Sequence, residues 1–121
     1  MNGWIGVDLD GTLAVYDDWR GVEHIGEPIA PMVERVKAWI AEGVDVRIFT
    51  ARVYGEGRAH AISPIERWCI EHIGCELPVT CTKDYGMVEL WDDRAVQVIP
   101  NTGIPLRESL CDSQTLGTGV K

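Results

Sequence analysis

Two aspartates separated by a single residue, Asp8 and Asp10, end a short apolar segment and are followed at once by Gly11 and Thr12. Carboxylates held this close repel each other, so their placement is costly unless a cation lies beside them. A cation also lets a carboxylate approach an anionic phosphate, and aspartate can act as a covalent nucleophile. Aspartate at a strand end is often only a turn former, but this pair beside a glycine favours a phosphate-handling site.

Such chemistry needs elements that bring distant residues together. Segments rich in apolar and β-branched residues predict five strands, and two segments with a 3.6-residue apolar period predict helices. The first helix begins at Pro31 and ends before Gly43, and the second begins in a Ser-Pro-Ile-Glu capping box at residues 63–66 and ends at Gly74. The predicted strands cover residues 4–9, 44–50, 77–82, 88–91 and 95–99.

Strands that alternate with helices imply a parallel sheet with helices on its faces. The sequence therefore predicts an α/β protein with a three-layer α/β/α Rossmann-like fold around a mostly parallel sheet of about five strands. It predicts one domain over residues 1–111 and a flexible tail over residues 112–121, which are rich in Gly, Ser and Thr. Ligands of such sheets bind beyond the carboxyl ends of the strands.

Polar side chains follow four of the predicted strands at that edge of the sheet. Carboxylates and water form the oxygen-rich octahedral shell that Mg²⁺ prefers, so we expect Mg²⁺ as the cofactor. A hydroxyl and an ammonium group opposite the cation could hold the oxygens of a phosphoryl group. In isolation, Thr50 reads as a strand residue and Lys83 as a solvated surface lysine. The set consists of Asp8 and Asp10, then Thr50, then Lys83, then Asp92 and Asp93.

In this order the motifs resemble those of phosphatases of the haloacid dehalogenase superfamily. The resemblance runs from about residue 4 to residue 99. The first motif is specific by itself, whereas the single threonine and lysine gain weight only from their order. The matching residues are Asp8-Leu9-Asp10-Gly11-Thr12, Phe49-Thr50-Ala51-Arg52, Lys83 and Trp91-Asp92-Asp93.

The resemblance implies a Mg²⁺-dependent phosphohydrolase that acts on a phosphorylated metabolite such as a nucleotide or a sugar phosphate. Asp8 would be the nucleophile and form an aspartyl-phosphate, and Asp10 would be the general acid and base. The metal would be bound by Asp8, the main-chain carbonyl of Asp10 and Asp92, with Asp93 binding through water or orienting the site. Thr50 and Lys83 would hold the transferred phosphoryl group.

Neither gap between the motifs is long enough for a cap domain, so the chain resembles the capless, minimal members of that superfamily. It is most similar to small bacterial members of unassigned substrate with a Gly-Glu-x-Ile stretch before the first helix, here at residues 26–29. An open site goes with a bulky substrate or with a neighbouring subunit that serves as the lid. A homo-oligomer is therefore a further expectation.

Other interpretations stay open. A mutase of the same superfamily would need a cap to exclude water. A signalling receiver also gathers acids, a threonine and a lysine, but its acid pair follows the first strand and its phosphorylated aspartate comes later. A catalytically silent module on this fold is the third alternative. The sequence also leaves open the roles of Arg52, which could reach the substrate or form a surface ion pair, and of Trp19 and His24.

Composition limits the partners. The 121 residues carry a net charge of −8 without a basic cluster, so no nucleic-acid partner is expected. No apolar run approaches the ~20 residues that span a bilayer, and no signal peptide is evident, so we expect a cytoplasmic protein without a membrane partner. The four cysteines lack zinc-type spacing and are expected to be free thiols.

Overall fold

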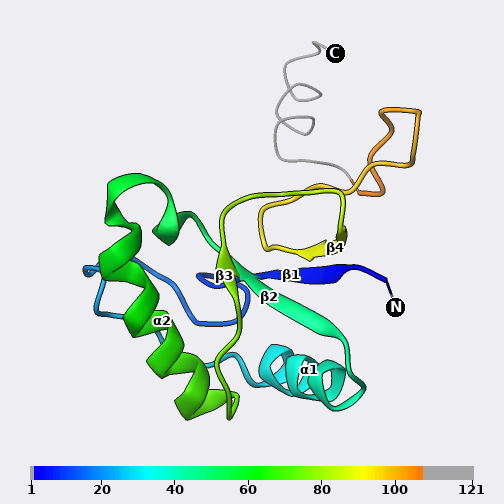
Figure 1. The fold of residues 1–121 in the computed structure, drawn as a ribbon. Helices are drawn as coiled ribbons and strands as arrows, with labels where there is room; N and C mark the ends of the chain where they lie inside the picture. Colours follow the sequence, from blue (N-terminus) through cyan, green and yellow to red (C-terminus); the bar gives the residue numbers. More distant parts are fainter. Residues whose placement is uncertain (1, 108–121) are drawn as a thin grey trace.

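The structure is a computed structural model and describes residues 2–107. Four parallel strands form one sheet in the order β3-β2-β1-β4 (Figure 1). The strands are β1 (Trp4–Asp8), β2 (Asp45–Phe49), β3 (Val79–Thr80) and β4 (Met87–Trp91), and the helices are α1 (Ala30–Ala41) and α2 (Arg58–His72), with two short 3₁₀ turns at Ala51–Val53 and Gly55–Gly57.

The strand β1 lies inside the sheet and pairs with β2 on one side and β4 on the other. Its pairing therefore sets where the segments after β2 and β4 begin. In the register, Asp8 pairs with Phe49 of β2, and Val7 pairs with Trp91 of β4. The three strands therefore end at the same edge, as parallel strands do when their pairing is in step. Residues that directly follow β1, β2 and β4 meet there.

The main core lies on one face of the sheet. Side chains alternate between the faces of a strand, and Ile5 and Val7 of β1 share one face with Val46 and Ile48 of β2. These side chains belong to a single buried cluster with residues of both helices, namely Met32, Val33 and Val36 of α1 and Ala61, Ile65, Trp68 and Cys69 of α2. Both helices consequently pack on the same face.

The prediction of an α/β fold with a parallel sheet is confirmed, but its layering differs. The helix α1 connects β1 to β2, and α2 connects β2 to β3, so both connections move toward the same edge of the sheet. Right-handed connections that move toward the same edge place their helices on the same face. A helix on the other face would belong in the connection from β3 to β4, which spans only residues 81–86 and holds none. On that face Trp4 is buried beneath the guanidinium of Arg47, 4.7 Å from its ring centroid, and donates to Asp84 at 2.9 Å.

Two predicted elements need correction. The strand expected at 95–99 is absent from the described sheet, which has four strands rather than five. Instead Val98 forms an isolated antiparallel bridge with Pro105 across a turn that includes Asn101 at φ 67°. The second helix begins at Arg58 rather than in the capping box, and Pro64 lies inside it. Proline costs that helix one internal hydrogen bond, and its ring is buried in return.

The long connection from β1 to α1 contains no helix among its described residues. Its ends are held together because Val15 N donates to the carbonyl of Glu27 at 2.8 Å and Ala14 bridges Pro28. No cap domain occurs within residues 2–107, and the predicted tail at 112–121 lies outside the described part of the chain. Among the described helices, none has the length and apolar character needed to cross a membrane.

Candidate metal centre

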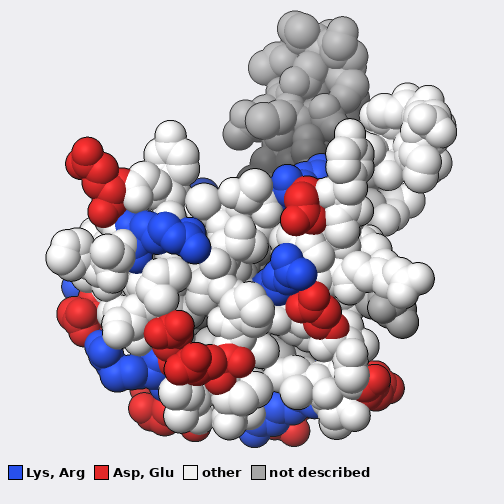
Figure 2. All heavy atoms as spheres, in the orientation of Figure 1, with Lys and Arg blue, Asp and Glu red and all other residues white. Residues whose placement is uncertain are grey.

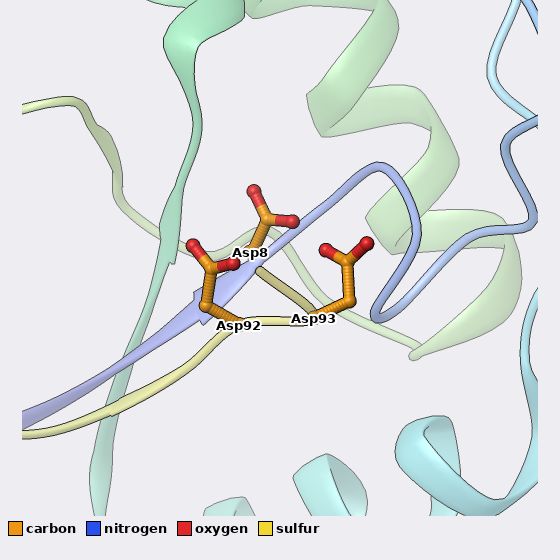
Figure 3. Close-up of side chains that lie close together, drawn as sticks. All are labelled: Asp8, Asp92 and Asp93. Atoms are coloured by element: carbon orange, nitrogen blue, oxygen red, sulfur yellow. The ribbon is translucent and has the colours of Figure 1, made fainter. Parts of the chain in front are cut away.

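Three carboxylates converge at the carboxyl edge of the sheet. Asp8 is the last residue of β1, and Asp92 and Asp93 directly follow β4, the strand paired with β1. Each offers an oxygen atom, and these atoms all lie within 4.8 Å of one another. Figure 3 shows the three carboxyl groups projecting to the same side from two neighbouring segments of chain. This donor set fits a hard divalent cation such as Mg²⁺.

The electrostatics of Asp8 reflect this crowding. Burial, the charge of Asp92, a hydrogen bond and charge from Asp93, and the charge of Asp10 together raise the pKa of Asp8 from 3.8 to about 7. A cation between the carboxylates would offset the repulsion that raises this pKa. The arrangement is therefore costly without a cation, and a bound cation would lower that cost.

Thr12 joins the two segments that carry the carboxylates. Its hydroxyl oxygen accepts from the backbone N–H of Asp93 at 3.0 Å, and its O–H lies within reach of Asp93 Oδ1 at 3.2 Å and Asp8 Oδ2 at 3.4 Å. Next to it Gly11 has φ +91°, and a Cβ atom there would lie 2.5 Å from Asp93 Oδ2. The Gly-Thr pair thus allows the first loop to approach Asp93 closely.

Aromatic packing holds the end of β4 in place. Trp91, the residue before Asp92, contacts Trp39 of α1 edge-on with ring centroids 5.2 Å apart. The guanidinium of Arg35 lies 4.9 Å from the Trp91 ring centroid. Because α1 belongs to the main core, these contacts fix the strand end, and with it the position of Asp92, relative to β1.

Asp10 is held by Arg52 in a bidentate ion pair. Nε of Arg52 donates to Asp10 Oδ2 at 2.8 Å, and Nη2 donates to Asp10 Oδ1 at 2.9 Å. The Arg52 side chain is only 5% exposed and also donates to the carbonyls of Val22 and His24. Arg52 therefore forms a partly buried ion pair rather than a surface one, and it ties Asp10 to residues 22–24 further along the same connection.

Thr50 lies where the sequence places it, at the end of β2. The residue is buried, and its hydroxyl oxygen accepts from the backbone N–H of Arg52 at 3.1 Å, which caps the short turn at Ala51–Val53. Accepting this bond leaves the single hydroxyl proton of Thr50 able to donate toward the cavity that the residue lines.

A cavity of about 630 Å³ opens above these groups. Asp8, Asp10, Thr50, Arg52, Asp92 and Asp93 all line it, so the structure brings together six of the seven residues predicted for the site. The wall also contains aromatic and basic side chains that the sequence did not assign to the site. They are Tyr16, Trp19, Phe49 and Arg94.

Lys83 is the predicted site residue that this cavity does not include. It is exposed and lines a neighbouring cavity of about 750 Å³ beside β4. Asp92 is the one predicted site residue that lines both cavities. Its role toward a phosphoryl group stays a prediction.

The surface of the described residues carries charges of both signs. On the face shown in Figure 2, acidic and basic side chains lie beside one another rather than in separate fields. Surface pairs on the first loop follow the same pattern, with Arg20 2.8 Å from Asp17 and Arg67 of α2 2.9 Å from Glu23. These exposed pairs contribute little energy but help to place the loop.

Among the residues missed by sequence reasoning, Thr12 had the clearest signal. It lies inside the first motif, and a hydroxyl two residues after an aspartate can bond acidic neighbours. Arg94 follows the second acid pair, and its backbone N–H donates to Asp92 Oδ1 at 2.7 Å. Tyr16 carried no signal, since nothing in its surroundings in the sequence distinguishes it from other loop aromatics.

The fold and this cluster define an α/β protein with a carboxylate-rich site at the carboxyl edge of a parallel sheet. No protein-family model matches the chain, and no curated protein matches it. Among solved structures, the chain is similar to a conserved protein from Bacteroides thetaiotaomicron, with 23% sequence identity and a TM-score of 0.55. The match covers 100% of this chain and 94% of the other. At this identity the likeness supports the fold.

Proposed function

We propose that the protein is a Mg²⁺-dependent phosphohydrolase that cleaves phosphate monoesters through an aspartyl-phosphate on Asp8. The observation that carries the proposal is the cluster of three carboxylates, whose oxygens lie within 4.8 Å of one another at the floor of a cavity. A metal bound by Asp8, Asp92 and Asp93, together with the main-chain carbonyl of Asp10, would neutralise charge on a phosphoryl group.

In the first step a carboxylate oxygen of Asp8 bonds to phosphorus while the bond from phosphorus to the leaving oxygen breaks. Asp10 donates a proton to that oxygen, so the alcohol leaves neutral. In the second step Asp10 takes a proton from water, the water oxygen bonds to phosphorus, and the bond to Asp8 breaks. Inorganic phosphate and the free carboxylate of Asp8 result.

The contacts of Asp10 are compatible with its double role. Arg52 occupies one lone pair on each carboxylate oxygen, and each oxygen has a second one that can face the cavity. The bidentate contact fixes the plane of the carboxylate, which is the positioning that proton transfer requires. Thr50 would donate its hydroxyl proton to an oxygen of the phosphoryl group.

The covalent step can be tested by trapping the phosphoryl adduct. Protein incubated with acetyl phosphate and Mg²⁺, then quenched in acid and digested, should carry a phosphoryl adduct on the peptide that contains Asp8. The adduct should turn over in the wild type and should be absent in Asp8→Asn. A stable adduct without release of phosphate would instead favour a receiver, and an adduct on Asp92 or Asp93 would overturn the assignment of the nucleophile.

A further inference from the structure

Two large aromatic side chains are exposed at the wall of the site. Trp19 is 53% exposed and Tyr16 is 42% exposed, and both line the cavity that contains the three carboxylates. Both belong to the loop between β1 and α1. Exposed aromatic rings grouped at a polar cavity mark a surface that binds a ligand.

The ring of Trp19 packs against the side chain of Arg52. The guanidinium of Arg52 lies 4.8 Å from its centroid, a cation–π contact. Arg52 is itself fixed by Asp10 and by the carbonyls of Val22 and His24. The indole therefore rests on a rigid support and keeps about half of its surface open.

The loop that carries Trp19 is also anchored at its base. A Cβ atom on Gly26 would overlap the carbonyl oxygen of Val15, so the two sides of the loop touch there. Nε1 of Trp68 in α2 donates to the carbonyl of Gly26 at 2.9 Å. The aromatic wall is thus positioned before any ligand arrives, which lowers the entropic cost of binding.

We propose that Trp19 stacks on a planar ring of the substrate, so that the substrate is a phosphate monoester that carries an aromatic group, such as a nucleoside monophosphate. This inference rests on the proposed function, which places the phosphoryl group at Asp8. The same cavity of about 630 Å³ is lined by Asp8 and by Trp19, so one small molecule can contact both. Stacking on an aromatic side chain accepts any nucleobase, since every base has a π-face.

Adenosine monophosphate and ribose phosphate, phosphorylated on the same ribose oxygen, form the matched pair for a test, since they differ only at the anomeric carbon, which carries the base in one and a hydroxyl in the other. The wild type with Mg²⁺ should hydrolyse the nucleotide with a kcat/KM on the order of tenfold or more above that of the sugar phosphate. Trp19→Ala should abolish this preference by raising the KM of the nucleotide and should leave the sugar phosphate little changed. Trp19→Phe should restore much of the preference, and Tyr85→Ala, an exposed aromatic outside the cavity, should retain it in full.

A second pair, nitrophenyl phosphate and glycerol phosphate, distinguishes a nucleobase from a simple aryl group as the ring that Trp19 binds. A larger effect of Trp19→Ala on the nucleotide assigns the ring to a nucleobase, and a larger effect on nitrophenyl phosphate assigns it to a simple aryl group. Equal losses for ring-bearing and ring-free substrates would overturn the inference, because Trp19 would then only support Arg52. If no phosphate ester is hydrolysed, the proposed function fails, and calorimetric titration with adenosine monophosphate and ribose phosphate still tests the preference for a ring.

Discussion

Arg52 donates hydrogen bonds to both carboxylate oxygens of Asp10, at 2.8 Å and 2.9 Å. It lies two residues after Thr50, the residue that follows β2. The contact joins two of the motifs that lie 42 positions apart in the sequence. It also connects them to the loop between β1 and α1 through the carbonyls of Val22 and His24. This one guanidinium therefore couples the proposed acid and base to the wall of the substrate cavity.

Replacing Arg52 with lysine should show whether catalysis needs its bidentate contact with Asp10 or only its positive charge. Arg52→Lys keeps a cation but lacks the planar fork that binds a carboxylate at two points. We expect kcat to fall on the order of tenfold to a hundredfold, since hydrogen bonds to charged groups are worth roughly 1.5–3 kcal/mol. Mg²⁺ affinity should change much less than kcat, because Arg52 contacts the side chain of Asp10 and none of the three clustered carboxylates.

The matched control for that change is Arg47→Lys. Arg47 also binds an aspartate at two points, Asp45 at 2.9 Å and 3.3 Å, but at the opposite end of β2 from the site. Steady-state kinetics should show no loss of kcat in this control. An unaltered kcat in Arg52→Lys would contradict the positioning role.

The carboxylate cluster should control the binding of Mg²⁺. Asp92→Asn removes one anionic oxygen from a set of three, and we expect the Kd for Mg²⁺ to rise by about tenfold or more. Asp93→Asn should weaken binding and also disturb the contact with Thr12. Isothermal titration calorimetry measures both, with Asp45→Asn at the other end of the sheet as the control. Equal Mg²⁺ affinity in all four proteins would remove Asp92 and Asp93 from the metal centre.

The raised pKa of Asp8 predicts how stability depends on pH. Between its ordinary pKa of 3.8 and about 7, the folded protein holds a proton on Asp8 that the unfolded chain has already released. In that range the contribution of Asp8 to stability falls as pH rises, and it is fully present only below the unfolded pKa. Thermal unfolding in EDTA should therefore show a decline in Tm between about pH 4 and 7 that Asp8→Asn lacks.

Mg²⁺ should reverse this trend, because the metal binds the deprotonated carboxylate and stabilises the folded protein by mass action. The same measurement with Mg²⁺ should give a rise in Tm that grows toward neutral pH. A rise in Tm that is as large at low pH as at neutral pH would contradict the involvement of Asp8 in the metal centre.

Gly26 offers a test of how the loop is anchored. A Cβ atom added to Gly26 would overlap the carbonyl oxygen of Val15, which is backbone and cannot turn aside. We expect Gly26→Ala to lower the free energy of unfolding by about 1–3 kcal/mol and to raise KM for the substrate. Gly57→Ala meets no atom within 4 Å and serves as the control in denaturant titrations. Equal stability of the two variants would show that the loop is not held at this point.

The sequence contained enough information for most of the site. Asp8 ends an apolar strand, Thr50 and Asp92 directly follow two others, and parallel strands bring their carboxyl ends to one edge. The ion pair of Arg52 with Asp10 could not be predicted in this way, because it depends on how the intervening loop folds. The same is true of Trp19, whose contact with Arg52 exists only once that loop is in place.

The errors in the fold have local causes. Residues 95–99 are β-prone, but a turn at 100–104 folds the chain back on them. They therefore pair with residues 104–106 instead of with the sheet. Pro64 resembles a helix start, yet the six residues before it are already helical because Ala61 joins the core on the same face as Ile65. In both cases tertiary packing outweighs a local signal.

Release of inorganic phosphate tests the central claim most directly. Wild-type protein, Asp8→Asn and wild-type protein in EDTA are each incubated with a panel of phosphate monoesters that includes nucleotides and sugar phosphates. The proposal predicts release by the wild type with Mg²⁺ and loss of that release both in Asp8→Asn and in EDTA. Release that persists in Asp8→Asn, or a wild type that releases no phosphate from any ester with Mg²⁺, would contradict it.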